Sequence, residues 1–234
     1  MTTAIILAGG LGTRLRETVP NLPKPMAPIN GRPFLEHQLD YWIGQGVKRF
    51  VLSVGYRHEA ITGHFGAAYR GIALDYAIES SALGTGGGLL LAAERLSGDA
   101  AFLVLNGDTY FEANLASLCS LHGAKQADWT FALFRAAEVG RYTGIGIADD
   151  GRITSLKAGT GRPGQLANGG VYLLNPGMLR IGGWKPGEKV SLEDDILPAA
   201  FAAGRRLYGL ECGGTFIDIG VPQDYARARR LLTI

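Results

Sequence analysis

Cysteine is scarce in this sequence, and no apolar run is long. Two cysteines, Cys119 and Cys212, in 234 residues are too few for a disulfide framework, and neither stands in a metal-ligand spacing. No apolar stretch approaches the roughly 20 residues of a membrane span, and no basic segment precedes an apolar one at the start, as it would in a secretory signal. The sequence therefore predicts a cytoplasmic protein of a reducing compartment, with no membrane partner.

An excess of charge of either sign is missing as well. The 23 lysines and arginines nearly balance the 21 aspartates and glutamates, which gives a net charge of +2. Arg227, Arg229 and Arg230 form the densest basic group, and we interpret them as the solvated face of a last helix. Because the other basic residues are scattered, the sequence argues against a nucleic-acid partner.

Glycine, by contrast, is abundant. Its 35 copies in 234 residues are about twice the usual share of ~7%, and they follow no collagen period. With 47% hydrophobic and 19% charged residues, the composition is not that of a disordered chain. The glycine excess therefore indicates places where a folded protein needs a permissive or closely approached backbone.

Short apolar runs alternate with helical patterns along the chain. This alternation is typical of an α/β fold, and we predict one Rossmann-like domain over residues 1–234, with a mixed, mostly parallel sheet flanked by helices. The second half is expected to contain a smaller, partly antiparallel subregion. The expected strands are residues 4–7, 50–54, 74–79, 102–105, 129–134, 144–147, 153–156, 171–174, 206–211 and 215–219. The expected helices are residues 33–45, 58–69, 86–96, 191–203, which begins with the capping pair Ser191 and Asp194, and a last one from Pro222.

A glycine-rich turn follows the first expected strand. It reads Leu7-Ala8-Gly9-Gly10-Leu11-Gly12-Thr13-Arg14-Leu15, and Pro23-Lys24-Pro25-Met26 comes next. Backbone N–H groups of glycines can approach a polyphosphate closely, while Arg14 offers a forked cation and Lys24 a point charge. The turn is not a Walker loop, which needs Gly-Lys-Ser/Thr, and it is not a dinucleotide fingerprint, because Leu15 replaces the last glycine. It predicts a phosphate site of another kind.

Three carboxylates come at or just after the ends of other expected strands. Asp108 follows residues 102–105 and an Asn-Gly turn, and Asp218 follows Thr215-Phe216-Ile217. Ligands bind at the carboxyl ends of strands in open α/β sheets, and two carboxylates with phosphate oxygens suit Mg²⁺. Glu79 ends a third strand, where it is either a surface charge or a ligand-binding acid, since a carboxylate can accept from N1–H and the N2 amino group of guanine together.

Together these motifs resemble the G-x-G-T-R-L…P-K-P signature of the sugar-1-phosphate nucleotidyltransferases. The resemblance covers nearly the whole chain, since three further motifs stand in the family's order, at residues 106–108, 168–172 and 216–220. Within the family, three segments are most similar to the D-glycero-α-D-manno-heptose 1-phosphate guanylyltransferases, namely residues 23–29, 79–87 and 141–142. The resemblance implies a GT-A-like nucleotidyltransferase fold, with a nucleotide-binding half (about residues 1–125) and a sugar-phosphate-binding half (about residues 126–234).

The resemblance also implies a reaction. A guanylyl group would pass from GTP to a heptose 1-phosphate, giving GDP-heptose and pyrophosphate for a surface polysaccharide such as a capsule, an S-layer glycan or lipopolysaccharide. An oxygen of the sugar phosphate would attack the α-phosphorus in line, and because that phosphate is already ionised, no general base is required. Catalysis then depends on alignment and on charge neutralisation by Mg²⁺, with Arg14, Lys24 and Asp108 as the catalytic residues.

The family's site residues map onto numbered positions of this sequence. The implied nucleotide-binding residues are Leu7, Ala8, Gly9, Gly10, Gly12, Thr13, Arg14, Lys24, Glu79, Gly84, Thr85 and Asp108. The implied sugar-phosphate-binding residues are Asn106, Tyr142, Thr143, Gly144, Lys157, Asn168 and Gly169, and the implied metal ligands are Asp108 and Asp218.

The loops around the base and the sugar carry further expectations. Thr85 is expected to cap the helix that follows it, and the glycines at 84 and 86–88 to line the base loop. Gly169 and Gly170 are expected to admit the sugar ring. Lys157 is displaced from the position of the family's sugar-phosphate lysine, so either Lys157 or Arg162 would take that role.

Three other functions remain open. The protein is alternatively a uridylyltransferase for an amino-sugar phosphate of the N-acetylmuramate type, or a guanylyltransferase for another sugar such as mannose 1-phosphate. A non-catalytic, nucleotide-sensing homologue is the third, although the intact Arg14, Lys24, Asp108 and Asp218 count against it. No hexapeptide repeats follow residue 220, which excludes an appended acyltransferase β-helix, and exposed aromatics in the second half would support a homodimer.

Overall fold

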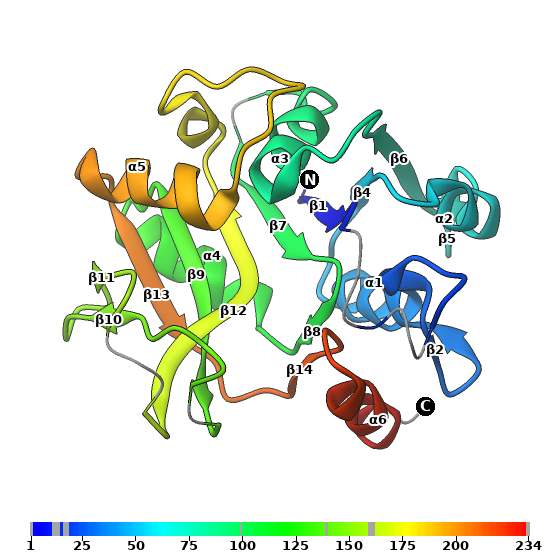
Figure 1. Ribbon diagram of the computed structural model, residues 1–234. Coiled ribbons are helices and arrows are strands. Elements are labelled where there is room, and N and C mark those ends of the chain that lie inside the picture. Colours follow the sequence, from blue (N-terminus) through cyan, green and yellow to red (C-terminus); the bar gives the residue numbers. More distant parts are fainter. Residues whose placement is uncertain are drawn as a thin grey trace.

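An eight-stranded sheet runs through the protein, in the order β13-β9-β12-β7-β1-β4-β6-β5 (Figure 1). The structure is a computed structural model and describes residues 2–10, 15, 19–98, 100–138, 140–158 and 162–232. The strands of this sheet are β1 (Thr3–Ala8), β4 (Arg49–Val54), β5 (Ala68–Tyr69), β6 (Ile72–Ile78), β7 (Phe102–Asn106), β9 (Trp129–Ala136), β12 (Gln165–Leu174) and β13 (Leu207–Glu211). Only β12 and the short edge strand β5 pair antiparallel with their neighbours. The predicted mixed, mostly parallel sheet is confirmed.

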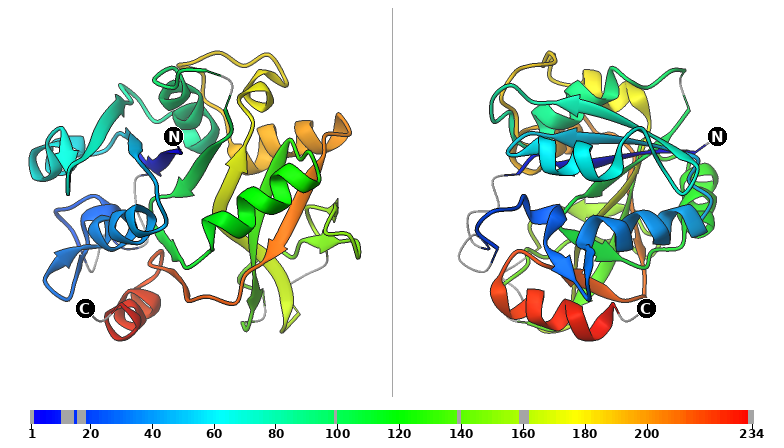
Figure 2. Two further views of the ribbon diagram at one scale, coloured as in Figure 1. Left: turned by 180° about the vertical axis from the view of Figure 1, so that it is seen from behind. Right: turned by 90° about the vertical axis from the view of Figure 1, so that its right-hand side faces the viewer.

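Helices cover both faces of the sheet. The helices are α1 (Phe34–Gly44), α2 (His58–Phe65), α3 (Gly84–Ala93), α4 (Leu115–Ala124), α5 (Leu197–Ala202) and α6 (Pro222–Leu231), and the buried hydrophobic residues of α6 belong to a third core beside the sheet. In Figure 1, α3 and α5 lie in front of the sheet, while the view from behind in Figure 2 shows α4 across its other face. Side chains of β9 alternate between these faces, because Trp129 and Phe131 belong to the front core, and Ala132 and Phe134 to the back core.

Three two-stranded antiparallel sheets lie beside the main sheet. They pair β2 (Pro28–Ile29) with β3 (Arg32–Pro33), β8 (Thr109–Phe111) with β14 (Phe216–Asp218), and β10 (Gly146–Ile147) with β11 (Ile153–Ser155). Two 3₁₀ helices, Lys24–Met26 and Pro176–Arg180, and a π-helical turn, Leu192–Ile196, complete the elements. The expected smaller, partly antiparallel subregion is thus present in the second half.

Several predicted elements differ from the observed ones. The helix α4 is not among the expected elements, although the Asn114 side chain caps it by accepting from Ser117 N (2.8 Å). The strand expected at 171–174 begins six residues earlier, at Gln165. A bulge at Gly170 (φ +68°) shifts the pairing register, and the strand continues on both sides of it. Of the expected exposed aromatics, Phe201 is the one that is largely exposed among the described residues.

The capping pair at Ser191 is confirmed and extended. Ser191 Oγ accepts from Asp194 N (3.0 Å), and the return bond runs from Ser191 N to the carboxylate of Asp195 (2.8 Å). The return partner comes one residue later than in an ordinary capping box because the helix opens with a π turn.

The length and apolar character of the helices decide whether any could span a membrane. Within the part of the chain that the structure describes, none is both long enough and apolar enough to cross a bilayer.

Candidate active site

The sheet has a topological switch point beside β1. From β1 the chain builds outward through β4 to β6, and it then returns to place β7 on the other side of β1. Ligands of open α/β sheets bind outside the carboxyl ends of the strands at such a point. A cleft of about 630 Å³ opens there.

All described residues of the predicted nucleotide site line this cleft. They are Leu7, Ala8, Gly9, Gly10, Lys24, Glu79, Gly84, Thr85 and Asp108. Gly12, Thr13 and Arg14 lie outside the described residues. The structure thus brings the glycine-rich turn, the lysine of the P-K-P motif and two strand-end carboxylates to one cavity.

Glu79 extends from the end of β6 into the cleft. Its carboxylate accepts from the Ser53 hydroxyl (3.1 Å) and from Leu83 N (3.2 Å), which fixes its orientation. Burial raises the pKa of Glu79, and these two hydrogen bonds oppose the shift. Gly9 passes so close to this carboxylate that a β-carbon at Gly9 would collide with it. The phosphate turn and the candidate base-binding acid are therefore in direct contact.

The two predicted metal ligands lie at one end of the small sheet that β8 and β14 form, with Asp108 just before β8. Asp218 ends β14 opposite Thr109 of β8, and Ile219 N donates to Asp108 O (3.0 Å). Lys24 Nζ lies 2.5 Å from Asp108 Oδ2. Burial and the charge of Asp108 raise the pKa of Asp218, while Lys24, the Gly220 N–H and Arg141 oppose this shift.

These two acids fit a divalent cation. Two neighbouring carboxylates, one of them already paired with an ammonium group, form a site that favours positive charge. Mg²⁺ takes few protein ligands and completes its shell with phosphate oxygens and water. The donor set therefore suits a metal shared between the protein and a phosphorylated substrate.

The glycine run at the start of α3 has a different partner from the one predicted. Gly86 N and Gly87 N both donate to Val190 O (3.0 Å each), and Val190 N donates to Leu83 O (2.9 Å). We call residues 188–193 the docking segment, because this stretch covers the N-terminus of α3. Gly84 and Gly88 line the cleft, so the expectation that all four glycines line the base loop is wrong for Gly86 and Gly87.

Thr85 belongs to the same contact. Its Oγ1 donates to Glu193 Oε2 (2.6 Å) and accepts from Leu192 N (3.0 Å). The N-cap of α3 is Leu83, which has no capping side chain, so the prediction of a Thr85 cap is wrong. The docking segment also adds Lys189 and Glu193 to the cleft lining. Sequence reasoning missed both, because the capping pair at Ser191 marks a helix start without showing where it packs.

Of the predicted sugar-site residues, Asn106 lines the cleft and Asn168 lies outside its lining. The buried Oδ1 of Asn106 accepts no hydrogen bond from any residue that the structure describes. Asn168 Nδ2 donates to the Tyr172 hydroxyl (2.7 Å), and its Oδ1 accepts from Gly170 N (3.0 Å). Burial raises the pKa of the Tyr172 hydroxyl, and the charges of Glu193 and Asp108 add to the shift.

Other side chains of the protein fill the space beside Gly169 and Gly170. A β-carbon at Gly169 would strike the Phe111 ring, and one at Gly170 would lie 2.8 Å from Asn106 Nδ2. The space at these positions therefore belongs to two side chains, contrary to the expectation that it admits a sugar ring.

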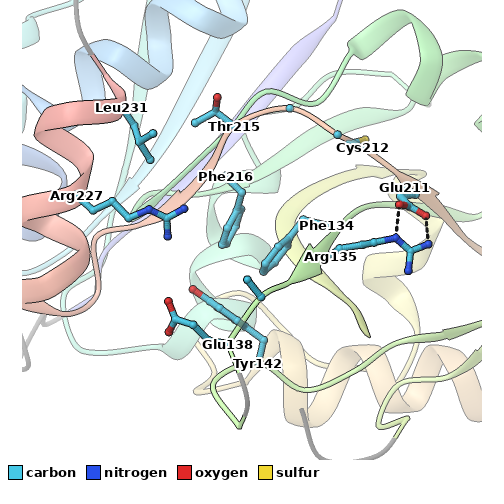
Figure 3. A pocket seen from close by; sticks show the side chains of 13 residues that line it. Phe134, Arg135, Glu138, Tyr142, Glu211, Cys212, Thr215, Phe216, Arg227 and Leu231 are labelled. Atoms are coloured by element: carbon cyan, nitrogen blue, oxygen red, sulfur yellow. Dashed lines mark hydrogen bonds and ion pairs between the residues drawn. The ribbon is translucent and has the colours of Figure 1, made fainter. Parts of the chain in front are cut away.

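The remaining predicted sugar residues lie apart from the cleft lining. Tyr142 stands edge-on to Phe134 and Phe216, which stack with centroids 3.7 Å apart in a second cavity of about 440 Å³ (Figure 3). Thr143 is exposed, and Gly144 is covered by the Gln165 side chain. Lys157 and Arg162 are exposed, and the side chain of neither forms a hydrogen bond or ion pair with the described residues.

Arg141 contacts both Tyr142 in the lining of the second cavity and Asp218, one of the two predicted metal ligands. It pairs with the buried Asp224 of α6, lies 3.8 Å from Asp218 and 3.3 Å from Glu138, and stacks its guanidinium over Tyr142. Desolvation lowers the pKa of Arg141, but its interactions with Asp224, Tyr142 and Glu138 together outweigh this effect, so the pKa is raised. A helix at the end of the chain is thereby connected to a residue of the candidate metal site.

Comparison with known proteins agrees with this geometry. Residues 3–233 match the Nucleotidyl transferase family. The chain is 41% identical over 230 residues to a D-glycero-alpha-D-manno-heptose 1-phosphate guanylyltransferase of Aneurinibacillus thermoaerophilus, covering 98% of this chain and 97% of that protein. A protein of the same description from Campylobacter jejuni is 37% identical, covering 95% and 96%. The crystal structure of HddC from Yersinia pseudotuberculosis, at 32% identity, matches with a TM-score of 0.85 over all of both chains, and its complex with GMP-PN with 0.84.

Proposed function

Because the chain belongs to the nucleotidyl transferase family, we propose that it transfers a guanylyl group from GTP to D-glycero-α-D-manno-heptose 1-phosphate. The products are GDP-heptose and pyrophosphate, and the GDP-heptose would supply a surface polysaccharide. The two relatives of nearly equal length support this sugar and this nucleotide, since both are described as heptose 1-phosphate guanylyltransferases. The observation in the structure that carries the proposal is the meeting of Gly9, Gly10, Lys24 and Asp108 in one cleft, with the charge of Asp108 acting on Asp218 beside it.

The chemistry follows from the charges in that cleft. An oxygen of the sugar phosphate attacks the α-phosphorus of GTP, the new P–O bond forms, and the bond to pyrophosphate breaks. The attacking phosphate is ionised at neutral pH, so no proton has to be removed. The protein's task is to align two anions and offset their charge, which suits Lys24 and the backbone N–H groups of Gly9 and Gly10.

Asp108 and Asp218 are the residues that would hold Mg²⁺. Bound there, the metal would neutralise charge on the phosphates during transfer. Lys24, held against Asp108, places a second positive charge beside the same phosphates. Asp108 would thus serve two functions, because its carboxylate would bind the metal and also orients Lys24.

Glu79 supports guanine as the base. Guanine presents N1–H and the N2 amino group side by side, and a carboxylate can accept from both at once. Uracil and adenine offer no such pair of neighbouring donors. Ser53 and Leu83 N hold the Glu79 carboxylate in place before the nucleotide arrives, so little ordering is needed on binding.

A screen of substrates tests the proposal. The purified protein is assayed for pyrophosphate release with GTP, UTP, CTP, ATP and dTTP, each against the heptose, mannose and N-acetylmuramate 1-phosphates and with Mg²⁺. We expect the highest kcat/KM for GTP with the heptose phosphate. A preference for UTP would overturn the nucleotide assignment, a preference for mannose 1-phosphate would overturn the sugar, and no pyrophosphate from any pair would overturn the activity.

A further inference from the structure

Two residues of the docking segment face the cleft without an assigned ligand. We infer that Lys189 binds the phosphate group of the sugar 1-phosphate, and that Glu193 accepts hydrogen bonds from the sugar's hydroxyls. The inference rests on the proposed function, because it assigns the sugar half of the same cleft. It departs from the sequence-based expectation, which gives the phosphate to Lys157 or Arg162.

The backbone that carries Lys189 is held rigidly. Its neighbour Val190 is buried and bonded in both directions to the start of α3, through Gly86 N, Gly87 N and Leu83 O. On the far side, Ser191 is bonded to the first turn of the helix that it caps. Lys189 itself stays exposed between these anchors. Its ammonium group can therefore reach a ligand without any change in the backbone.

Charge balance points to Lys189 as the phosphate partner. The cations that line the cleft, in the described ranges, are Lys24 and Lys189, and Lys24 already pairs with Asp108. Lys189 forms no ion pair with any described residue, while Glu79, Asp108 and Glu193 line the same cavity. A sugar phosphate brings a charge of about −2 at neutral pH. An unpaired lysine in an otherwise acidic cleft is suited to offset it.

Glu193 adjoins the residues that the sequence assigns to the sugar. One of its carboxylate oxygens accepts from Thr85 Oγ1, which leaves the other oxygen as a free acceptor. Its charge acts on the Tyr172 hydroxyl, and this hydroxyl is the partner of Asn168 Nδ2. Asn106, with its unpartnered Oδ1, lines the same cleft. The second Glu193 oxygen and Asn106 Oδ1 are two acceptors in one cleft, which suits a ligand that is rich in hydroxyl groups.

Steady-state kinetics with the two substrates varied separately test Lys189. We expect Lys189→Ala to raise the KM for the sugar phosphate by about 10- to 100-fold, the usual effect of losing a charged hydrogen bond, and to leave the KM for GTP nearly unchanged. Lys189→Arg should recover most of the loss. Lys157→Ala tests the competing assignment, and Lys48→Ala, at an exposed lysine outside the cleft lining, is the matched control that should change neither KM. A large effect of Lys157→Ala with none of Lys189→Ala would overturn the inference.

Glu193→Gln tests the second half, because glutamine keeps the acceptor for Thr85 while it removes the charge. We expect a rise of about tenfold in the KM for the sugar phosphate alone. A rise in the KM for GTP alone would move Glu193 to the nucleotide side and refute its role. The wild-type protein is measured first with the substrate screen, and the variants are then tested on whichever sugar phosphate it uses. A wrong choice of sugar therefore leaves the test of Lys189 intact, and a wild-type protein without any turnover counts against the proposed function instead.

Discussion

The position of Asp218 suits metal binding but disfavours its charged form in the folded protein. Burial and the nearby Asp108 charge raise its pKa above that of an ordinary aspartate, so its ionised form is disfavoured in the folded protein. A folded-state pKa above the unfolded value means that the protonated group favours folding. Its contribution is then present at low pH and is lost as the pH rises through the folded value. At neutral pH the charged Asp218 therefore lowers the free energy of unfolding.

Asp218→Asn should remove this penalty. Asparagine keeps an oxygen for the Gly220 N–H, which donates to Asp218 Oδ1 at 2.6 Å. We expect a higher melting temperature than that of the wild type at pH 7 without metal, together with a loss of turnover by orders of magnitude. Thermal unfolding followed by circular dichroism at pH 4 and pH 7 measures both ends of the range. A variant less stable than the wild type at pH 7 would show that the acid pair is stabilised in some other way.

Glu79 carries the second prediction at this scale. Glutamine in its place has one acceptor oxygen and cannot pair with both guanine donors. We therefore expect Glu79→Gln to raise the KM for GTP by about 10- to 100-fold. Burial raises the pKa of Glu79, so its carboxylate becomes protonated at a higher pH than an ordinary glutamate does. As the pH is lowered, the wild-type KM for GTP should therefore begin to rise at that higher pH. The glutamine variant should lack that acid limb. Ser53→Ala is the matched control, since it removes one orienting bond and keeps the carboxylate.

At the scale of the elements, the contact between α3 and the docking segment needs glycine. A β-carbon at Gly87 would strike Glu188 O and lie 2.8 Å from the Leu83 β-carbon. Gly87→Ala should therefore displace the docking segment and with it Lys189. We expect a loss of roughly 1–3 kcal/mol of stability, as for other overpacked sites, and a raised KM for the sugar phosphate.

Gly123 offers the matched control. It lies in α4, and nothing surrounds the position of its β-carbon within 4 Å. Gly123→Ala should raise the stability by about 0.5–1 kcal/mol, because alanine is the better helix former, and leave both KM values unchanged. Urea unfolding of the two variants supplies the free energies. Equal effects of the two substitutions would mean that the docking segment does not depend on Gly87.

Some of the elements could be predicted from the sequence, and α4 could not. The buried strands expected at 50–54 and 102–105 fall within β4 and β7, because a short apolar run between turns has few other solutions. The strand-end residues Glu79 and Asp108 could be predicted for the same reason, since parallel strands bring their carboxyl ends to one edge. The helix α4 is missed because its apolar face is diluted by alanine, serine and glycine.

Contacts between distant segments could not be predicted. Nothing in the sequence around Val190 shows that its carbonyl will receive two glycine N–H groups of α3. Nor does the pattern near Gly169 show that Phe111 fills the space beside it. For this reason the sequence does not show that Lys189 lines the cleft or that the Tyr142 ring lines the second cavity. Such positions depend on tertiary packing, which local periodicity does not encode.

At the scale of the whole molecule, the last helix is tied to the candidate metal site. Asp224 of α6 is buried and pairs with Arg141, whose guanidinium also lies 3.8 Å from Asp218. Arg227 adds a weaker pairing, with 3.9 Å between its Nη1 and Asp224 Oδ1. Arg141 is therefore shared between an acid that anchors α6 and an acid that would bind metal. Loss of the anchor should affect both stability and the site.

Asp224→Ala tests this coupling. It removes the partner of a half-buried arginine, and we expect it to lower the free energy of unfolding by about 1–3 kcal/mol, less than the ~3–5 kcal/mol that breaking a fully buried pair costs. With Asp224 gone, Arg141 has Asp218 as a remaining acidic neighbour, and a tighter pairing between them would compete with metal. The concentration of Mg²⁺ needed for half-maximal turnover should then rise. Arg227→Ala removes only the exposed, long pairing and should cost at most about 1 kcal/mol. An Asp224→Ala protein that is destabilised but keeps the wild-type Mg²⁺ requirement would show that α6 supports the fold alone, and that Arg141 does not carry its effect to Asp218.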